Sequence, residues 1–121
     1  MAELGKRTLV IDLDGVLATG TKETVYSEQA GWAYENCVPV EGALDFLRQM
    51  HKEYRIVVST ARLLIDREKT QKWLQENGFM PYIDELQVGI KEPAFAYIDD
   101  RAIEFHGDWN EVAEKVKVRA G

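Results

Sequence analysis

Residues 10–16 read Val-Ile-Asp-Leu-Asp-Gly-Val, and this stretch decides how the chain folds and where its chemistry is expected. It continues an apolar run over 8–13 that is rich in β-branched residues, which predicts a buried strand. Asp12 and Asp14 are two positions apart, so their side chains would point to the same side of an extended chain. Gly15 then allows a sharp turn and a close approach of a ligand to the backbone. Two carboxylates therefore crowd one end of a core strand, where they need a cationic partner.

The bulk composition predicts one compact domain over 1–121, because a chain of 121 residues can bury one sizeable core. The formal net charge is −6, so we expect no bulk, non-specific binding to nucleic acids. Cys37 is the only cysteine, which excludes an intrachain disulfide. The first residues contain no apolar run of the length that a signal peptide or a membrane helix needs. We therefore expect a cytoplasmic protein that makes no contact with membranes.

Strand-like and helix-like patterns alternate along the chain, which predicts an α/β fold with a parallel sheet and helices on both of its faces. Residues 15–40 are looser, and we expect them to form at most a small flap. Asp108 and Glu111 stand in a capping-box pattern, which predicts the start of the last helix. We expect strands over 8–13, 55–59, 81–88, 94–98 and 102–105, and helices over 41–53, 64–77 and 108–118.

Polar residues follow the predicted strands at the place where parallel sheets bind ligands, the crevice beyond the carboxyl ends of the strands. Four carboxylates, a hydroxyl group and two cationic groups would meet there: Asp12, Asp14, Asp99 and Asp100, Thr60 followed by Ala61, and Arg62 with Lys91. Crowded carboxylates need a cation, and ligands that are all oxygen favour a hard one, so we expect Mg²⁺. Its ligands would be the side chains of Asp12, Asp99 and Asp100 and the backbone carbonyl of Asp14.

These residue types can transfer a phosphoryl group. A carboxylate beside Mg²⁺, such as Asp12, can attack phosphorus and form an aspartyl phosphate. Asp14 can protonate the leaving oxygen and then take a proton from the water that hydrolyses the intermediate. Thr60 can donate its hydroxyl to a phosphoryl oxygen, and Lys91 can balance the negative charge. Arg62 can bind a phosphoryl oxygen or another oxygen of the substrate.

Taken in order, these stretches resemble the four motifs of the haloacid dehalogenase (HAD) superfamily of phosphohydrolases. The motif DxDG is residues 12–15, and the apolar run that ends in Ser or Thr is residues 56–60, followed by Ala61 and Arg62. The motif lysine is Lys91, and the acidic pair after an apolar run closes residues 96–100. The four motifs occur in the order typical of the superfamily and span most of the chain.

The resemblance implies a three-layer Rossmann-like fold with about five strands in the order 5-4-1-2-3. It also implies a Mg²⁺-dependent phosphatase in which Asp12 is the nucleophile and Asp14 is the general acid and base. The dehalogenase branch lacks the second aspartate, so dehalogenation is not expected. Neither 15–40 nor 78–91 is long enough for a large cap domain, and the chain resembles a capless or minimally capped member.

The sequence leaves several choices open. Either Ser59 or Thr60 could contact the phosphoryl group, and we prefer Thr60 because Thr-Ala-Arg resembles the form seen in several relatives. Either Asp99 or Asp100 could be the direct metal ligand. The substrate could be a sugar phosphate, a nucleotide or the phosphorylated end of a polynucleotide. Capless relatives act on large substrates or borrow cover from a partner subunit, which leaves open a homodimer that covers the site.

Two other classes of function remain alternatives. A phospho-accepting receiver module also uses carboxylates, a hydroxyl and a lysine around Mg²⁺, but its acidic pair follows the first strand. In this chain the DxD pair comes first and the acidic pair comes last, which argues against a receiver. A catalytically degenerate HAD-like binding subunit is the other alternative, and the intact carboxylates argue against it.

Overall fold

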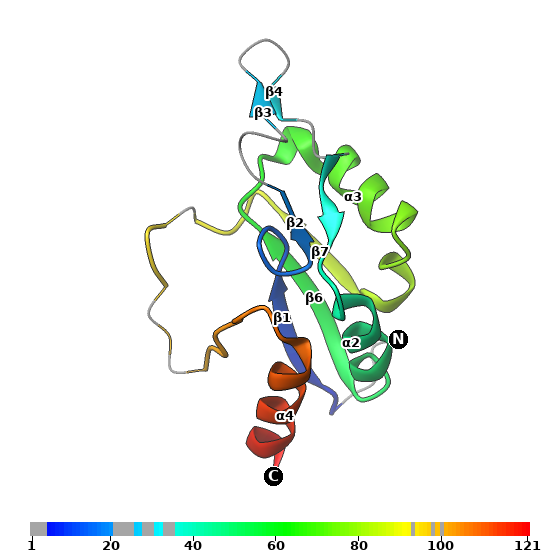
Figure 1. The fold of residues 1–121 in the computed structure, drawn as a ribbon, viewed down its shortest axis with the longest axis vertical. Helices are drawn as coiled ribbons and strands as arrows, with labels where there is room; N and C mark the ends of the chain where they lie inside the picture. Colours follow the sequence, from blue (N-terminus) through cyan, green and yellow to red (C-terminus); the bar gives the residue numbers. More distant parts are fainter. Residues whose placement is uncertain are drawn as a thin grey trace.

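The computed structural model describes residues 5–20, 36–92, 94–97, 99 and 101–121, together with the backbone of 26–27 and 31–32. The chain has an α/β fold (Figure 1). Its strands are β1 (Arg7–Asp12), β2 (Ala18–Thr19), β3 (Tyr26–Ser27), β4 (Gly31–Trp32), β5 (Val38–Pro39), β6 (Tyr54–Thr60) and β7 (Glu85–Val88). Its helices are α2 (Ala43–Met50), α3 (Arg67–Glu76) and α4 (Trp109–Ala120), with 3-10 turns at Leu64–Asp66 and Met80–Tyr82.

The main sheet of the described residues is parallel and has three strands in the order β1-β6-β7. The central strand β6 is the most deeply buried, because its apolar run Ile56, Val57 and Val58 is covered on both faces. The parallel register sets Asp12, the last residue of β1, opposite Ser59 of β6. The carboxyl ends of β1 and β6 therefore finish side by side (Figure 1).

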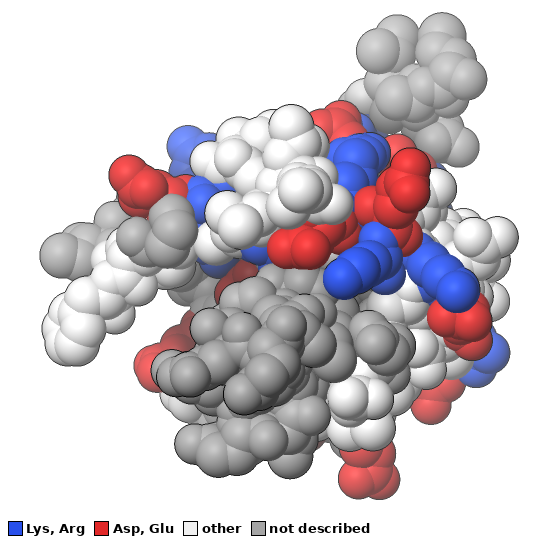
Figure 2. All heavy atoms as spheres, turned by 90° about the horizontal axis from the view of Figure 1, so that it is seen from above, with Lys and Arg blue, Asp and Glu red and all other residues white. Residues whose placement is uncertain are grey.

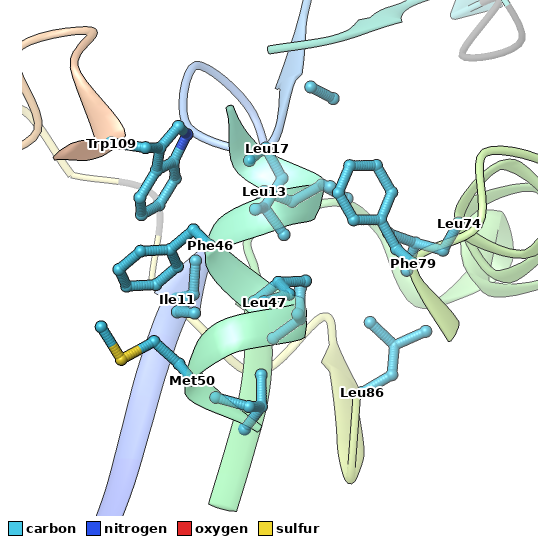
Figure 3. Packing of buried hydrophobic residues seen from close by; sticks show 14 of the residues in the cluster. Ile11, Leu13, Leu17, Phe46, Leu47, Met50, Leu74, Phe79, Leu86 and Trp109 are labelled. Carbon is cyan, nitrogen blue, oxygen red and sulfur yellow. The ribbon is translucent and has the colours of Figure 1, made fainter. Parts of the chain in front are cut away.

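Helices α2, α3 and α4 each bury one face against the rest of the molecule. The buried residues of α2 recur at helical spacing and are Ala43, Phe46, Leu47 and Met50. Phe46 meets Trp109 of α4 with ring centroids 4.4 Å apart, which ties the two helices together (Figure 3). In Figure 1, α4 lies at the β1 side of the sheet and α3 at the β7 side. The helices expected over 41–53, 64–77 and 108–118 are confirmed, each with shifted ends.

The cap of α4 differs from the expected capping box in one half. The carboxylate of Asp108 accepts a hydrogen bond from the amide of Asn110 at 2.9 Å, as an N-cap residue should. The carboxylate of Glu111, which should reach back to the N-cap amide, instead lies 2.9 Å from Nδ1 of His106. The helix start is therefore confirmed, while a contact between Glu111 and His106 replaces the reciprocal half of the box.

The expected strands over 94–98 and 102–105 do not form in the described parts of these ranges. Residues 94–97 belong to a loop that extends away from the sheet, and Phe95 is fully exposed there (Figure 1). Local contacts replace strand pairing, since Tyr97 donates a hydrogen bond to the carbonyl of Glu92. The amide of Arg101 likewise donates to the carboxylate of Asp99. The main sheet therefore holds three strands among the described residues, and a sheet of about five strands remains a prediction.

Residues 15–40 contain two short antiparallel pairs, β2 with β5 and β3 with β4. The pair β3–β4 stands beyond the carboxyl ends of the main strands in Figure 1. The expected flap includes 21–25, 28–30 and 33–35, which lie outside the described residues. In the part of the chain that the structure covers, every helix is too short or too polar to cross a membrane.

Candidate active site

The turn after β1 is closed by backbone hydrogen bonds and anchored in the core. The carbonyl of Leu13 accepts hydrogen bonds from the amides of Leu17 and Ala18, both at 2.9 Å. Leu13 and Leu17 are fully buried, so both ends of the turn are held by the core. Between them Gly15 has φ +84°, a conformation that glycine adopts without steric cost. This local structure leaves the neighbouring carboxylates, Asp12 and Asp14, partly exposed.

Asp12 lies between a backbone amide and a lysine. Its Oδ1 accepts a hydrogen bond from the amide of Leu13 at 2.8 Å, and its Oδ2 lies 3.4 Å from Nζ of Lys91. The ammonium of Lys91 also lies 4.5 Å from the ring centroid of Tyr97, within cation–π distance. The structure thus brings together two of the predicted site residues, Asp12 and Lys91, from separate parts of the chain.

Asp14 forms a bidentate ion pair with Arg62. Nη2 of Arg62 lies 2.7 Å from Oδ1 of Asp14, and Nε lies 2.9 Å from Oδ2. The Arg62 side chain is 2% exposed, whereas that of Asp14 is 51% exposed. The guanidinium therefore approaches the carboxylate from the protein interior. The structure gives Arg62 a protein partner, and its predicted contact with substrate remains a prediction.

Both candidate hydroxyl groups at the end of β6 are buried. Thr60 is almost fully buried, and its Oγ1 accepts a hydrogen bond of 3.1 Å from the amide of Arg62. Ser59 lies opposite Asp12 in the register of the sheet. The Thr60 hydroxyl can still donate its proton, so both residues stay candidates for the phosphoryl contact. Ala61 follows them as a half-buried link to Arg62.

In the described residues, the acidic pair at 99–100 is not brought to the site that contains Asp12 and Lys91. Asp99 is exposed, and its carboxylate accepts a hydrogen bond from the amide of Arg101 at 2.7 Å. Asp100 lies outside the residues that the structure describes. Within the described ranges, no group of three or more His, Cys, Asp or Glu side chains is gathered closely enough to hold a metal ion.

Two contacts of Arg62 were not predicted from the sequence. Its Nη1 donates to Oγ1 of Thr70 at 3.2 Å, and its Nη2 lies 4.0 Å from Sγ of Cys37. The sequence carried one usable signal, because Thr70 is three residues before Trp73 and four before Leu74 on the buried face of α3. A polar residue on such a face needs a buried partner.

The end of the molecule where the strands finish carries charges of both signs. Figure 2 looks onto this end and shows Lys and Arg side chains interspersed with Asp and Glu side chains around an uncharged area. A separate hollow of about 430 Å³ lies between the first turns of α2 and α4. Its charged lining residues are all acidic, Glu41, Asp45 and Asp108, so it is poorly suited to an anionic substrate.

A scan against protein-family models finds no family that matches the chain, and a search of curated proteins finds no match either. The function is therefore inferred from the residues and their geometry.

Proposed function

We propose that this chain is a Mg²⁺-dependent phosphatase that hydrolyses a phosphomonoester through an aspartyl phosphate on Asp12. The observation that carries the proposal is the convergence of three separate stretches at the ends of β1 and β6. Lys91 approaches the Asp12 carboxylate, and Arg62 pairs with Asp14. Two carboxylates and two cations at the carboxyl ends of parallel strands suit the binding and transfer of a phosphoryl group.

Asp12 has the exposure that a nucleophile needs, since its side chain is 37% exposed at the end of β1. Its carboxylate would attack phosphorus, and the bond from phosphorus to the leaving oxygen would break. Lys91 would offset the negative charge that Asp12 and the phosphoryl oxygens share. The Leu13 amide holds one carboxylate oxygen and thereby fixes the direction of the other.

Asp14 would act as the general acid and base, because it is partly exposed and only two residues from the nucleophile. In the first half of the reaction it would give a proton to the leaving oxygen. In the second half it would take a proton from the water that attacks the aspartyl phosphate. Thr60 or Ser59 would donate a hydrogen bond to a phosphoryl oxygen.

The donor set at this end of the sheet fits Mg²⁺ in its chemistry, because it consists of carboxylate and carbonyl oxygens. Asp12 offers an accessible carboxylate. In the proposal, Asp12, the Asp14 carbonyl and the pair Asp99–Asp100 would hold the ion. When bound, Mg²⁺ would neutralise the charge of the phosphoryl group and the surrounding carboxylates.

We further propose that the sheet is Rossmann-like and has about five strands in the order 5-4-1-2-3. Residues 94–98 would pair with the outer edge of β1 and bring the acidic pair to Asp12. Two exposed apolar surfaces support this pairing. Val10 of β1 is 65% exposed, and Phe95 is fully exposed within 94–97. Pairing would bury both of them.

Replacing Phe95 with alanine tests this pairing. If 94–98 is a buried strand, Phe95→Ala should lower the free energy of unfolding by about 3–5 kcal/mol. If the segment stays exposed, the change should lie within about 0.5 kcal/mol. Ile65→Ala serves as the control, because Ile65 is 86% exposed and lies elsewhere. If urea titrations give equal, small changes in the free energy of unfolding for both variants, the five-stranded sheet is contradicted.

The main experiment measures phosphate release from an aryl phosphate, and from a panel of sugar phosphates, nucleotides and 3′- or 5′-phosphorylated oligonucleotides, with Mg²⁺ and with EDTA. We expect hydrolysis that needs Mg²⁺ and that Asp12→Asn abolishes. The matched control is Asp45→Asn, which removes an exposed carboxylate on α2 that pairs with Arg48. Full activity in Asp12→Asn would overturn the proposal. A stable aspartyl phosphate without turnover would favour a receiver-like module, and failure to bind Mg²⁺ in calorimetry would favour a degenerate binding subunit.

A further inference from the structure

Arg62 is a buried cation whose guanidinium is fixed from several directions. Its side chain is 2% exposed. Nε and Nη2 hold the two oxygens of Asp14, and Nη1 donates to the hydroxyl of Thr70, which is fully buried on α3. Its own amide donates to Oγ1 of Thr60. The end of β6, the start of α3 and the turn after β1 are thereby joined through one side chain.

The geometry of the pair is one that arginine alone provides. The planar guanidinium presents parallel N–H donors that match the two oxygens of a carboxylate, whereas a lysine ammonium acts as a point charge. The distances of 2.7 and 2.9 Å show that both hydrogen bonds are made. A carboxylate held at both oxygens cannot rotate freely, yet each oxygen keeps a lone pair for a further partner.

We propose that Arg62 is a positioning residue for Asp14. It holds the Asp14 carboxylate in one orientation, two residues from the nucleophile, and Thr70 in turn holds the guanidinium of Arg62. This role rests on the proposed phosphatase function. It differs from a contact between Arg62 and the substrate, because Nε, Nη1 and Nη2 of Arg62 already donate hydrogen bonds within the protein.

A positioning residue and a substrate-binding residue have different kinetic signatures. With an aryl phosphate whose leaving group needs no proton, loss of positioning slows only hydrolysis of the aspartyl phosphate, so kcat and KM fall together while kcat/KM stays nearly unchanged. Loss of a substrate contact raises KM. Hydrolysis of the aspartyl phosphate needs a base, so misplacing Asp14 should also cause the phosphorylated enzyme to accumulate. A simple loss of folded protein lowers the apparent kcat but leaves KM unchanged, and it does not make the remaining enzyme accumulate covalent phosphate.

The test uses Arg62→Lys in the full chain, with an aryl phosphate whose leaving group needs no proton. We expect kcat to fall about 100-fold and KM to fall with it, so that kcat/KM stays nearly unchanged, and the acid-quenched enzyme to retain more covalent phosphate than wild type. Thr70→Val should give a smaller effect in the same direction, and Thr70→Ser should restore activity to near wild type. In an Asp14→Asn background, Arg62→Lys should cause little further loss, because it acts through Asp14.

The outcomes separate this proposal from the proposed function. A rise of about tenfold in KM at unchanged kcat would make Arg62 a substrate contact and overturn the positioning role alone. Wild-type values of kcat, KM and covalent phosphate in Arg62→Lys would also overturn it. If wild type neither hydrolyses phosphomonoesters nor becomes phosphorylated, the phosphatase function fails, and the positioning role fails with it. Thermal unfolding of each variant shows whether it is folded.

Discussion

Nζ of Lys91 lies 3.4 Å from Oδ2 of Asp12, which joins the loop after β7 to the end of β1. The same ammonium lies over the ring of Tyr97. Lys91 is therefore held between an anion and an aromatic face, with a side chain only 23% exposed. A lysine in these surroundings is oriented toward the proposed nucleophile before any substrate arrives.

Removing this lysine should slow phosphoryl transfer. Lys91→Met keeps the aliphatic stem and removes the charge that would offset the phosphoryl oxygens. We expect kcat to fall about 10²–10³-fold, the usual effect of losing one group that stabilises the transition state. Steady-state kinetics with an aryl phosphate measure it, and Lys52→Met, at an exposed position, is the control. Unchanged kcat in Lys91→Met would remove this lysine from the proposed mechanism.

The turn after β1 should be sensitive to a single methyl group at Gly15. An alanine there would keep a left-handed backbone at a cost of about 1–2 kcal/mol. A Cβ at this position would meet no other atom within 4 Å among the described residues, so backbone strain is the only penalty expected. Chemical denaturation of Gly15→Ala measures the loss, with Gly15→Asn as the control, because asparagine adopts a left-handed backbone more readily than alanine does. An equal loss in both variants would contradict this explanation.

Replacing a buried leucine with alanine should lower the stability of the fold more than replacing an exposed one. Leu47 of α2 is fully buried, whereas Leu63 is 65% exposed. Leu47→Ala leaves a cavity and should lower the free energy of unfolding by about 2–5 kcal/mol. Leu63→Ala should change it by no more than about 0.5 kcal/mol. Urea titrations of the two variants measure both values, and similar losses would contradict the packing of α2 against the sheet.

His106 should make stability depend on pH. The carboxylates of Glu111 and Glu104 raise the pKa of His106 above its ordinary value. The folded chain therefore binds this proton more tightly than the unfolded chain does. The contribution to stability is present below a pH of about 6.5 and is lost as the pH rises through the folded pKa of His106.

His106→Gln should therefore flatten the stability profile above a pH of about 6.5, measured by thermal unfolding at low salt. The effect should weaken in high salt, because these groups are exposed. Glu111 behaves in the opposite sense. His106 lowers the pKa of Glu111, so its contribution is lost as the pH falls through that lowered value. Identical pH profiles for His106→Gln and wild type would contradict the assignment.

The sequence predicted those strands and helices that leave a local pattern of apolar residues. The apolar run of β6 and the helical spacing on α2 identified both elements, because burial in a core imposes those patterns. The two strands expected over 94–98 and 102–105 were predicted from apolar runs alone. In the described residues, 94–97 and 102–105 form no strand, and the amide of Arg101 donates a hydrogen bond to the carboxylate of Asp99.

The sequence predicted which residues form the candidate site, but only some of the contacts between them. The sequence put Lys91 near Asp12, because both stretches end at the same edge of a parallel sheet. It could not show that Arg62 faces inward, since that depends on Thr70 of α3, which long-range packing brings to the guanidinium. The position of Thr70 on the buried face of α3 indicates that it needs a buried partner, but only the tertiary structure shows that this partner is Arg62.

The parallel pairing of β1 with β6 also constrains how the protein folds. The strand that ends in Asp12 finds its partner in the main sheet only at Tyr54–Thr60, far along the chain. The chain must close this long loop before the pairing gains any free energy, which slows folding relative to helical proteins of similar size. During synthesis, the proposed nucleophile thus emerges early and joins its sheet late.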